Sequence, residues 1–258
     1  MSLSWRDRVA VEVYPDRLVL ARASGGLARR STHREVVPVS PAEGLAARWR
    51  APLDRLAALP SELLAKSDVS VVLSSFFVRY ALMPWSDALA NEDERQAFAR
   101  HCFSRVYGAD ADGWAIKLSA SGAGKPQVAC AVEHTLVDAL STVVKAAAGR
   151  FSSLQPHLMA SFNRCRRALG EADAWFVDVE PGLASIGLLQ AGAWHSLRTV
   201  KVGPAWRQEL PGLLSREACL AETAVPCSQV AVFAPDDMDA PAETPGSLDR
   251  SFGVALEA

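Results

Sequence analysis

The stretch Val11-Glu12-Val13-Tyr14-Pro15-Asp16 returns in the second half of the chain as Val177-Asp178-Val179-Glu180-Pro181-Gly182. Each copy is followed by a second run rich in apolar residues, over 17–22 after the first copy and over 183–189 after the second. Strand, tight turn and strand in this order are the pattern of a β-hairpin. Because the pattern occurs twice, the sequence predicts a duplicated fold.

Composition excludes several classes of protein. The chain has 258 residues, half of them hydrophobic, and a net charge of -2, so it can bury one sizeable core or two small ones. Lys and Arg gather only briefly, as at Arg29-Arg30, which does not predict nucleic-acid binding. Trp5-Arg6-Asp7-Arg8 interrupts any signal peptide, and no run reaches the roughly 18–20 apolar residues of a membrane span. We expect a cytoplasmic protein without a span of its own.

The cysteines predict neither disulfides nor a zinc ribbon. The chain has five cysteines, an odd number, and no two of them form a C-x-x-C pair. They are Cys102, Cys130, Cys165, Cys219 and Cys227. Free cysteines are readily buried, so reduced core thiols are the expectation.

Apolar periodicity predicts the elements of the first half. They are strands over 34–39, 69–73 and 77–83, the last two joined by a turn, and a helix over 52–65 broken at Pro60. A long helix follows the N-cap Asn91 and its partner Glu94 and stops at Gly108. Its predicted buried face carries Ala97, Phe98, Cys102, Phe103 and Val106.

The remaining elements follow from the same reasoning. A hairpin is expected over 114–118 and 128–132, then a helix capped by Thr135 and running to Ala148, a strand over 151–158 and a helix over 159–169. After the second copy of the hairpin come a strand over 194–202, a helix over 204–220 and a final buried strand over 229–233. Residues 235–258 are predicted to form an acidic, Pro-rich loop or tail.

The order of these elements resembles that of the actin-like proteins of bacterial inner-membrane assembly platforms, namely PilM and MshI of type IV pilus systems and the cytoplasmic domain of GspL of type II secretion. The likeness is carried by the two hairpins, by residues 77–85 before the long helix, and by Trp175-Phe176-Val177-Asp178-Val179 with Gly192-Ala193-Trp194 downstream. It implies an α/β, actin-like (ribonuclease H-like) fold with duplicated β-hairpin-containing subdomains and mixed sheets flanked by helices. The expected subdomains are 1–160, with inserted β and α elements, and 161–234.

The resemblance also directs attention to the hairpin tips. In nucleotide-binding members of that superfamily the turn reads Asp-x-Gly, because a carboxylate holds hydrated magnesium while bare backbone amides approach the phosphates. Here Glu12 is followed by Tyr14, and Asp178 by Glu180, so the acid is kept and the glycine is lost. The degenerate phosphate-loop positions are thus Glu12, Asp178, Glu180 and Gly182, and side chains at these tips would block phosphate. Residues 234–236 likewise replace a glycine pair that commonly cradles adenosine.

Two functions are implied by the resemblance. The first is a cytoplasmic scaffold of a pilus or secretion platform that does not hydrolyse ATP, has no cofactor, and binds a membrane-anchored partner, with a motor ATPase as a second candidate partner. Phe76, Phe77 and Tyr80 are candidates for partner binding, although burial in a core would explain these aromatic side chains as well. The alternative is an active actin-like ATPase or kinase-like enzyme that binds Mg-ATP between its two subdomains. A third interpretation makes Glu12 and Asp178 merely outward polar positions of half-buried strands.

Other motifs give weaker signals. Ser121-Gly122-Ala123-Gly124-Lys125 lacks the first glycine and the final Ser or Thr of a phosphate-binding loop, and is interpreted as a hairpin turn. Glu133-His134 is the adjacent pair whose side chains most resemble a catalytic pair, but a structural role of the histidine at a strand-to-helix junction is favoured. The five histidines show no metal-ligand spacing with one another, so no metal site and no catalytic residue is predicted.

Overall fold

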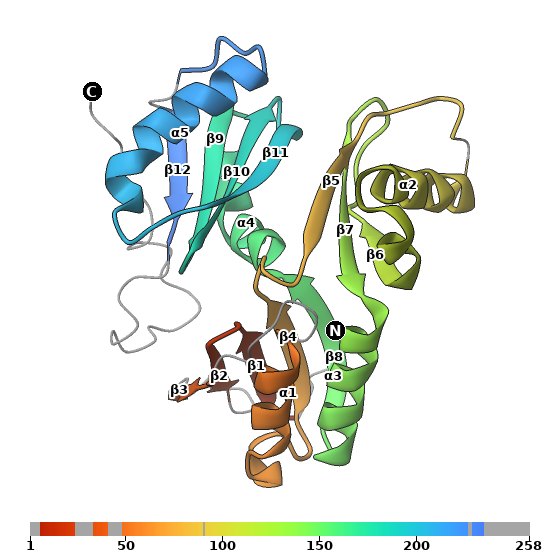
Figure 1. Ribbon diagram of the computed structural model, residues 1–258, viewed down its shortest axis with the longest axis vertical. Helices are drawn as coiled ribbons and strands as arrows, with labels where there is room; N and C mark the ends of the chain where they lie inside the picture. The colour runs from red at the N-terminus through yellow and green to blue at the C-terminus, as the bar shows by residue number, and fades with distance from the viewer. Residues whose placement is uncertain (1–5, 24–32, 41–47, 90, 227–228, 235–258) are drawn as a thin grey trace. The chain divides into compact units, whose positions relative to one another are not determined.

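The computed structural model of the protein describes residues 6–23, 33–40, 48–89, 91–226 and 229–234. Its strands form three sheets with the orders β3-β2-β1-β4-β8, β11-β10-β9-β12 and β5-β7-β6 (Figure 1). The chain divides into two compact units: the first holds the described residues up to Phe77 with Glu133–His157, and the second holds Val78–Val132 with the described residues between Leu158 and Ala234. Each unit therefore contains one large sheet, and the small sheet belongs to the second.

The first unit is built on the five-stranded sheet. Its strands are, in spatial order, β3 (His33–Pro38), β2 (Arg17–Ala23), β1 (Arg8–Val13), β4 (Asp68–Leu73) and β8 (Arg150–Pro156). β1 pairs antiparallel with β2 and parallel with β4, and β4 pairs parallel with β8. The first predicted hairpin and the strand predicted after it are therefore confirmed.

Two helices, α1 (Arg50–Ala57) and α3 (His134–Ala146), pack beside each other in the first unit, with α1 touching β2 and α3 touching β8. Their buried side chains are Pro52, Leu53, Leu56, Leu136, Leu140 and Val144. The helix predicted over 52–65 ends before Pro60, as expected, and a short 3₁₀ turn follows at Ser61–Leu63. The predicted cap of α3 is wrong: Thr135 lies inside the helix, because the chain enters α3 directly from the preceding strand through Glu133, which makes no side-chain cap.

The second large sheet repeats the first. It holds β11 (Ala193–Lys201), β10 (Leu183–Gln190), β9 (Ala174–Glu180) and β12 (Val230–Phe233) in that order. Both sheets contain three antiparallel strands that follow one another in the chain, and a later strand lies parallel to the first of the three. That later strand is β4, beside β1, in the first unit and β12, beside β9, in the second. The duplication expected from the two hairpins is thus present in the topology of both sheets.

Helices cover both faces of this second sheet. From α5 (Trp206–Leu220), Leu210 and Leu214 pack with the β9 residues Trp175, Val177 and Val179. On the opposite face, α4 (His157–Leu169) contributes Leu158 and Cys165 to a cluster with Phe176, Leu189 and Trp194. Because alternate β9 residues point to opposite faces, Asp178 and Glu180 share the α4 side with Phe176. The final strand β12 is only half-buried, contrary to expectation, because it pairs with β9 on one side and no further described strand joins its other edge.

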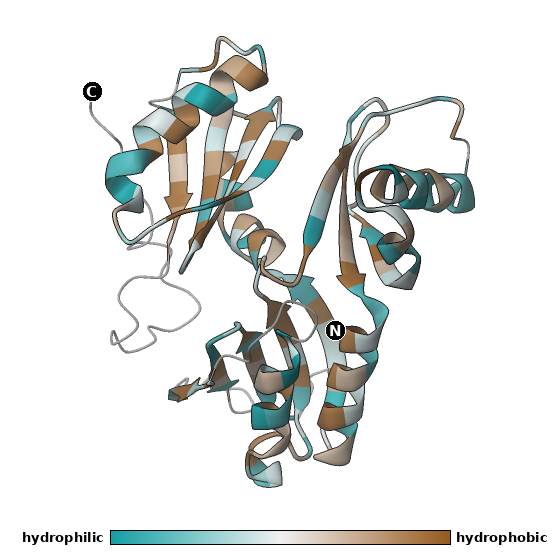
Figure 2. Cartoon of the chain, in the orientation of Figure 1, coloured by the Kyte–Doolittle hydropathy of each residue, from teal (hydrophilic) through white to brown (hydrophobic). Residues whose placement is uncertain are grey.

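The small sheet comprises β5 (Arg79–Met83), β7 (Gln127–Glu133) and β6 (Trp114–Leu118). Helix α2 (Glu92–Tyr107) packs on it and starts with the predicted capping box between Asn91 and Glu94. Figure 2 shows α2 as largely hydrophilic, in keeping with one buried stripe. The buried stripe consists of Ala99 and Phe103. The predicted buried face was therefore partly wrong, because Ala97 and Val106 are exposed and the exposed fraction of Val106 is 72%.

Strands β4 and β5 follow each other in the chain but belong to different sheets. The sequence suggested two core strands separated by a turn, and that turn exists, with the Phe77 amide donating to the Ser74 carbonyl over 3.0 Å. Both edges of β4 are already paired, one with β1 and the other with β8. No edge remains for β5, which pairs instead with β7.

Contacts group the inserted elements over Val78–Val132 with the second unit, whereas the sequence-based subdomain 1–160 placed them with the first hairpin. The predicted tail over 235–258 lies outside the described residues. Among the described residues, no helix combines the length and the apolar character needed to cross a membrane.

Candidate functional site at the hairpin tips

The two hairpins place Glu12 and Asp178 at the same position. Glu12 lies opposite Val19, and Asp178 lies opposite Ser185, so in both hairpins the acid faces the residue seven positions later. Both acids also lie next to a parallel strand, β4 in the first sheet and β12 in the second. The two acids therefore occupy equivalent positions in the pairing of the hairpin strands, as the repeated sequence predicted.

The tip of the first hairpin is filled by the ring of Tyr14, which is only 4% exposed. Its hydroxyl donates a hydrogen bond to Glu12 Oε2 over 3.0 Å, and its backbone amide donates to the Arg17 carbonyl. The Arg17 guanidinium lies 4.9 Å from the ring centroid and pairs with Asp16 at 3.3 Å. Pro15 has no amide hydrogen, so this turn presents a ring and a carboxylate where a phosphate would need free amides.

The tip of the second hairpin is made by Glu180, Pro181 and Gly182. Gly182 has φ +85°, a left-handed conformation that glycine adopts without strain, and its carbonyl accepts from the Val202 amide over 3.2 Å. Glu180 is 2% exposed and Asp178 is 1% exposed, in a strand that is buried along its whole length. Simple alternation therefore explains the half-buried Glu12 but not Asp178.

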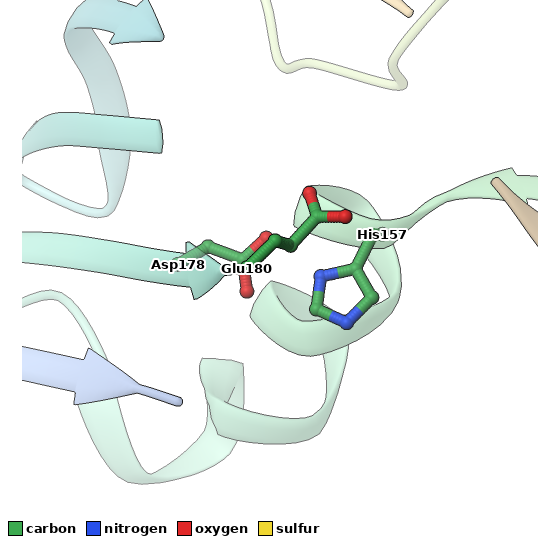
Figure 3. A group of neighbouring side chains, drawn as sticks. All are labelled: His157, Asp178 and Glu180. Atoms are coloured by element: carbon green, nitrogen blue, oxygen red, sulfur yellow. The ribbon is translucent and has the colours of Figure 1, made fainter. Parts of the chain in front are cut away.

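His157 lies beside the two acids of the second hairpin, as Figure 3 shows. One ligand atom of each of His157, Asp178 and Glu180 lies within 4.8 Å of the others, and all three residues are buried. His157 is the first residue of α4, a continuous helix that packs on β9 through Leu158 and Cys165. The sequence did not predict this group of side chains, since spacing among histidines alone cannot detect one histidine beside two carboxylates.

A neighbouring thiol responds to the same carboxylate. Burial, and secondarily the charge of Asp178, raises the pKa of the Cys165 thiol above its ordinary value. Cys165 is 6% exposed in the apolar cluster between α4 and β9. The expectation of core cysteines is met by Cys165, whereas Cys102 and Cys130 are half-buried and Cys219 is exposed.

The aromatic candidates for partner binding are half-buried. Phe76 and Phe77 end the first unit, and Tyr80 lies on β5 opposite Cys130, packed against the cluster that contains Phe176 and Trp194. Their role in binding stays a prediction.

Residues of the rejected motifs have structural partners. Glu133 accepts a hydrogen bond from the Trp49 indole over 2.7 Å, while His134 lies 2.8 Å from Asp138 at the exposed start of α3, so the pair is split between two contacts. The glycine-rich segment 121–125 is a turn in the loop between β6 and β7, where Ser121 Oγ donates to the Lys125 carbonyl. Of residues 234–236, only Ala234 is described.

The chain matches no protein-family model and no curated protein sequence. Solved structures do resemble it. A protein with an actin-like ATPase fold from Bacteroides thetaiotaomicron has a TM-score of 0.58 at 10% identity, covering 84% of this chain and 78% of that one.

Two further structures belong to the systems named by the sequence resemblance. The cytoplasmic domain of EpsL, an inner-membrane component of the type II secretion system of Vibrio cholerae, has a TM-score of 0.53 at 8% identity and covers 81% of this chain and 75% of its own. A chain of the PilM–PilN type IV pilus biogenesis complex has a TM-score of 0.54 at 17% identity, with 86% and 69% covered. Together with the duplicated hairpins and sheets, these likenesses show that the protein has the actin-like fold.

Proposed function

We propose that the protein is a cytoplasmic, actin-like scaffold of a bacterial type IV pilus or type II secretion assembly platform, and that it does not hydrolyse ATP. The observation that carries this proposal is the composition of the two hairpin tips. Tyr14 and Glu180 occupy the positions where nucleotide-binding members of the superfamily have glycine, and a proline follows each of them.

The residues present do not fit Mg-ATP. A phosphate at the first tip would meet the buried ring of Tyr14, whose amide is already bonded, and then Pro15 and the carboxylate of Asp16. At the second tip it would meet Glu180, whose negative charge repels phosphate most strongly where water is excluded. Phosphate sites need free amides and positive charge. At the first tip the Tyr14 amide is bonded, Pro15 has no amide hydrogen, and the Arg17 guanidinium is paired with Asp16.

A membrane-anchored protein is the proposed partner. Two of the similar structures support this proposal: the cytoplasmic domain of an inner-membrane component of type II secretion, and a PilM–PilN complex. A short cytoplasmic segment of a single-span protein would recruit this chain to the inner face of the membrane. A link to a motor ATPase belongs to the same proposal.

Binding of such segments can be measured directly. Fluorescent peptides would cover the cytoplasmic segments of single-span proteins encoded beside this chain's gene, and their anisotropy would be followed as the protein is added. We expect one peptide to bind and Tyr80→Ala to weaken it while the melting transition remains. Trp85→Ala, which removes another aromatic side chain of the same unit, 38% exposed, is the matched control. Binding by none of the peptides, or equal weakening by both variants, would contradict the assignment of partner and surface.

The second candidate function is an active actin-like ATPase. It is favoured by one observation: both hairpins retain an acid, Glu12 and Asp178, at the position where magnesium is held in the superfamily. A magnesium-dependent release of phosphate from ATP that Asp178→Asn abolishes would establish it in place of the scaffold.

A further inference from the structure

We propose that the apolar run Phe252-Gly253-Val254-Ala255-Leu256 pairs with the outer edge of β12 as a fifth strand of the second large sheet. The run lies outside the described residues, and its place is inferred from the described strand that it would cover. The proposal does not depend on the identity of a partner or on the scaffold function.

The two large sheets differ by one strand. In the first unit β4 lies between β1 and β8, whereas its counterpart β12 pairs with β9 and with no other described strand. Val69, Val71 and Leu73 of β4 are fully buried, while all residues of β12 are only half-buried. Within the described part of the chain, β12 therefore has no neighbour equivalent to β8.

The backbone of β12 directs alternate amides to its two edges. The Trp175 amide donates to the carbonyl of Gln229, the residue before β12, over 2.8 Å, and Trp175 is the ladder partner of Val230. In a parallel pair with this bond, Ala231 and Phe233 direct their backbone groups to β9. The intervening residues direct theirs to the outer edge, namely Val230 and Val232. These outward amides and carbonyls are the groups to which a further strand would bind.

Both faces of β12 are apolar. Val230 and Val232 pack with the core cluster on the α5 side, and Ala231 and Phe233 pack with the cluster on the α4 side. A hollow of about 590 Å³ lies beside the start of β12, and its lining includes Leu169, Ala172 and Ala231. A strand added at this edge would continue both clusters, so it needs apolar residues on both of its faces.

The run over 252–256 meets this requirement. Phe252, Val254 and Leu256 would share one face and the two small residues between them the other, so neither face carries a polar side chain. Residues 235–250 contain Asp, Glu and Pro throughout and hold no comparable run. They also exceed the length of about a dozen residues that a crossover to a parallel strand needs. In this position the run shields β12 from pairing with other chains.

Amide hydrogen exchange followed by NMR on the full chain tests the pairing. We expect the Val230 and Val232 amides to exchange at least about tenfold more slowly than the amides of residues 236–244, a ratio that an opening free energy of about 1.4 kcal/mol gives. Alternate amides within 252–256 should be protected as well. The inward amides of Ala231 and Phe233 are the internal control, since β9 protects them in any case. Rapid exchange of the outward amides beside slow exchange of the inward ones would show an open edge and overturn the proposal.

Val254→Asp distinguishes this run from any other cover of the edge. A carboxylate placed in an apolar cluster loses its hydration, so the variant should lose the protection of Val230 and Val232 while the inward amides stay protected. Ala242→Asp adds the same charge to the same part of the chain, outside the run, and should leave the exchange rates unchanged. Loss of protection in both variants, or in neither, contradicts the assignment of the run.

Dilution distinguishes a strand of the same chain from a strand of a second copy. Pairing within one chain does not depend on protein concentration, so the protection of Val230 and Val232 should stay constant over about a tenfold dilution. Protection that falls on dilution would identify pairing between copies and overturn the proposal.

Discussion

The hydroxyl of Tyr14 donates a hydrogen bond to Glu12 Oε2 over 3.0 Å, so the ring at the first hairpin tip is tied to the acid that precedes it by two positions. Under the proposed scaffold function, the Tyr14 ring takes the place of a phosphate and engages the carboxylate at the position where nucleotide-binding members of the superfamily hold magnesium. This arrangement distinguishes a packed hairpin tip from an open phosphate loop.

Tyr14→Phe should lower the free energy of unfolding by about 1 kcal/mol, because it removes a part-buried hydrogen bond to a carboxylate. Urea denaturation monitored by circular dichroism measures the change. Tyr107→Phe removes the hydroxyl of a tyrosine that is 39% exposed and should change stability by less than about 0.5 kcal/mol. Equal effects of the two variants would show that the Tyr14 bond contributes nothing.

Gly187→Ala should destabilise the protein by about 1–3 kcal/mol, because the new Cβ would lie 2.2 Å from the Trp194 ring. Trp194→Leu should reduce the cost of the glycine substitution when the two are combined, which a double-mutant cycle measures. Gly212→Ala serves as the control, for which we expect a change in stability of the opposite sign. It lies in α5 with no atom within 4 Å of its added Cβ and should stabilise the helix by up to about 1 kcal/mol.

Asn91→Ala should cost about 1 kcal/mol, since it removes the side-chain acceptor for the Glu94 amide at the start of α2. Asn91→Asp keeps an acceptor oxygen there and should retain the stability. Thermal unfolding of the two variants beside wild type checks the prediction, and a loss of similar size in both would count against the cap.

Cys130 should make the protein less stable as the solution becomes alkaline. Burial raises the pKa of this thiol from 9.0 to about 12, so the folded state keeps its proton at pH values where the unfolded chain releases it. Between about pH 9 and pH 11 the free energy of unfolding should therefore fall by up to about 1.4 kcal/mol per pH unit from this group.

Urea denaturation of wild type and Cys130→Ala across this range measures the contribution of the thiol. The variant should lose stability less steeply, because it has no thiol to titrate. Parallel pH profiles for the two proteins would refute the assignment.

Local patterns in the sequence predicted much of the fold. The two hairpins, the capping box at Asn91 and the break before Pro60 all depend on residues close together in the chain, so propensity and spacing are sufficient to find them. The separation of β4 from β5 depends on which strands already occupy the edges of β4, one of which, β8, lies far along the chain.

The candidate site divides in the same way. Glu12, Asp178 and Glu180 could be located because they belong to a repeated hairpin. His157 could not, because its position beside Asp178 and Glu180 arises from the packing of α4 on β9. The exposure of Val106 was also missed, since its apolar side chain fits the helical spacing but lies outside the stripe formed by Ala99 and Phe103.

The most direct test of the central claim, a scaffold that has lost its ATP site, is a thermal melt with and without Mg-ATP at high concentration. A ligand present at about 100 times its dissociation constant adds roughly 2.7 kcal/mol to the free energy of unfolding and raises the midpoint visibly. Magnesium alone and ATP alone are the controls, which separate the effect of the nucleotide complex from the effect of either ligand by itself. The scaffold account predicts no rise with Mg-ATP beyond these controls. A clear rise that Glu12→Ala and Asp178→Ala abolish would contradict the account and establish a nucleotide site.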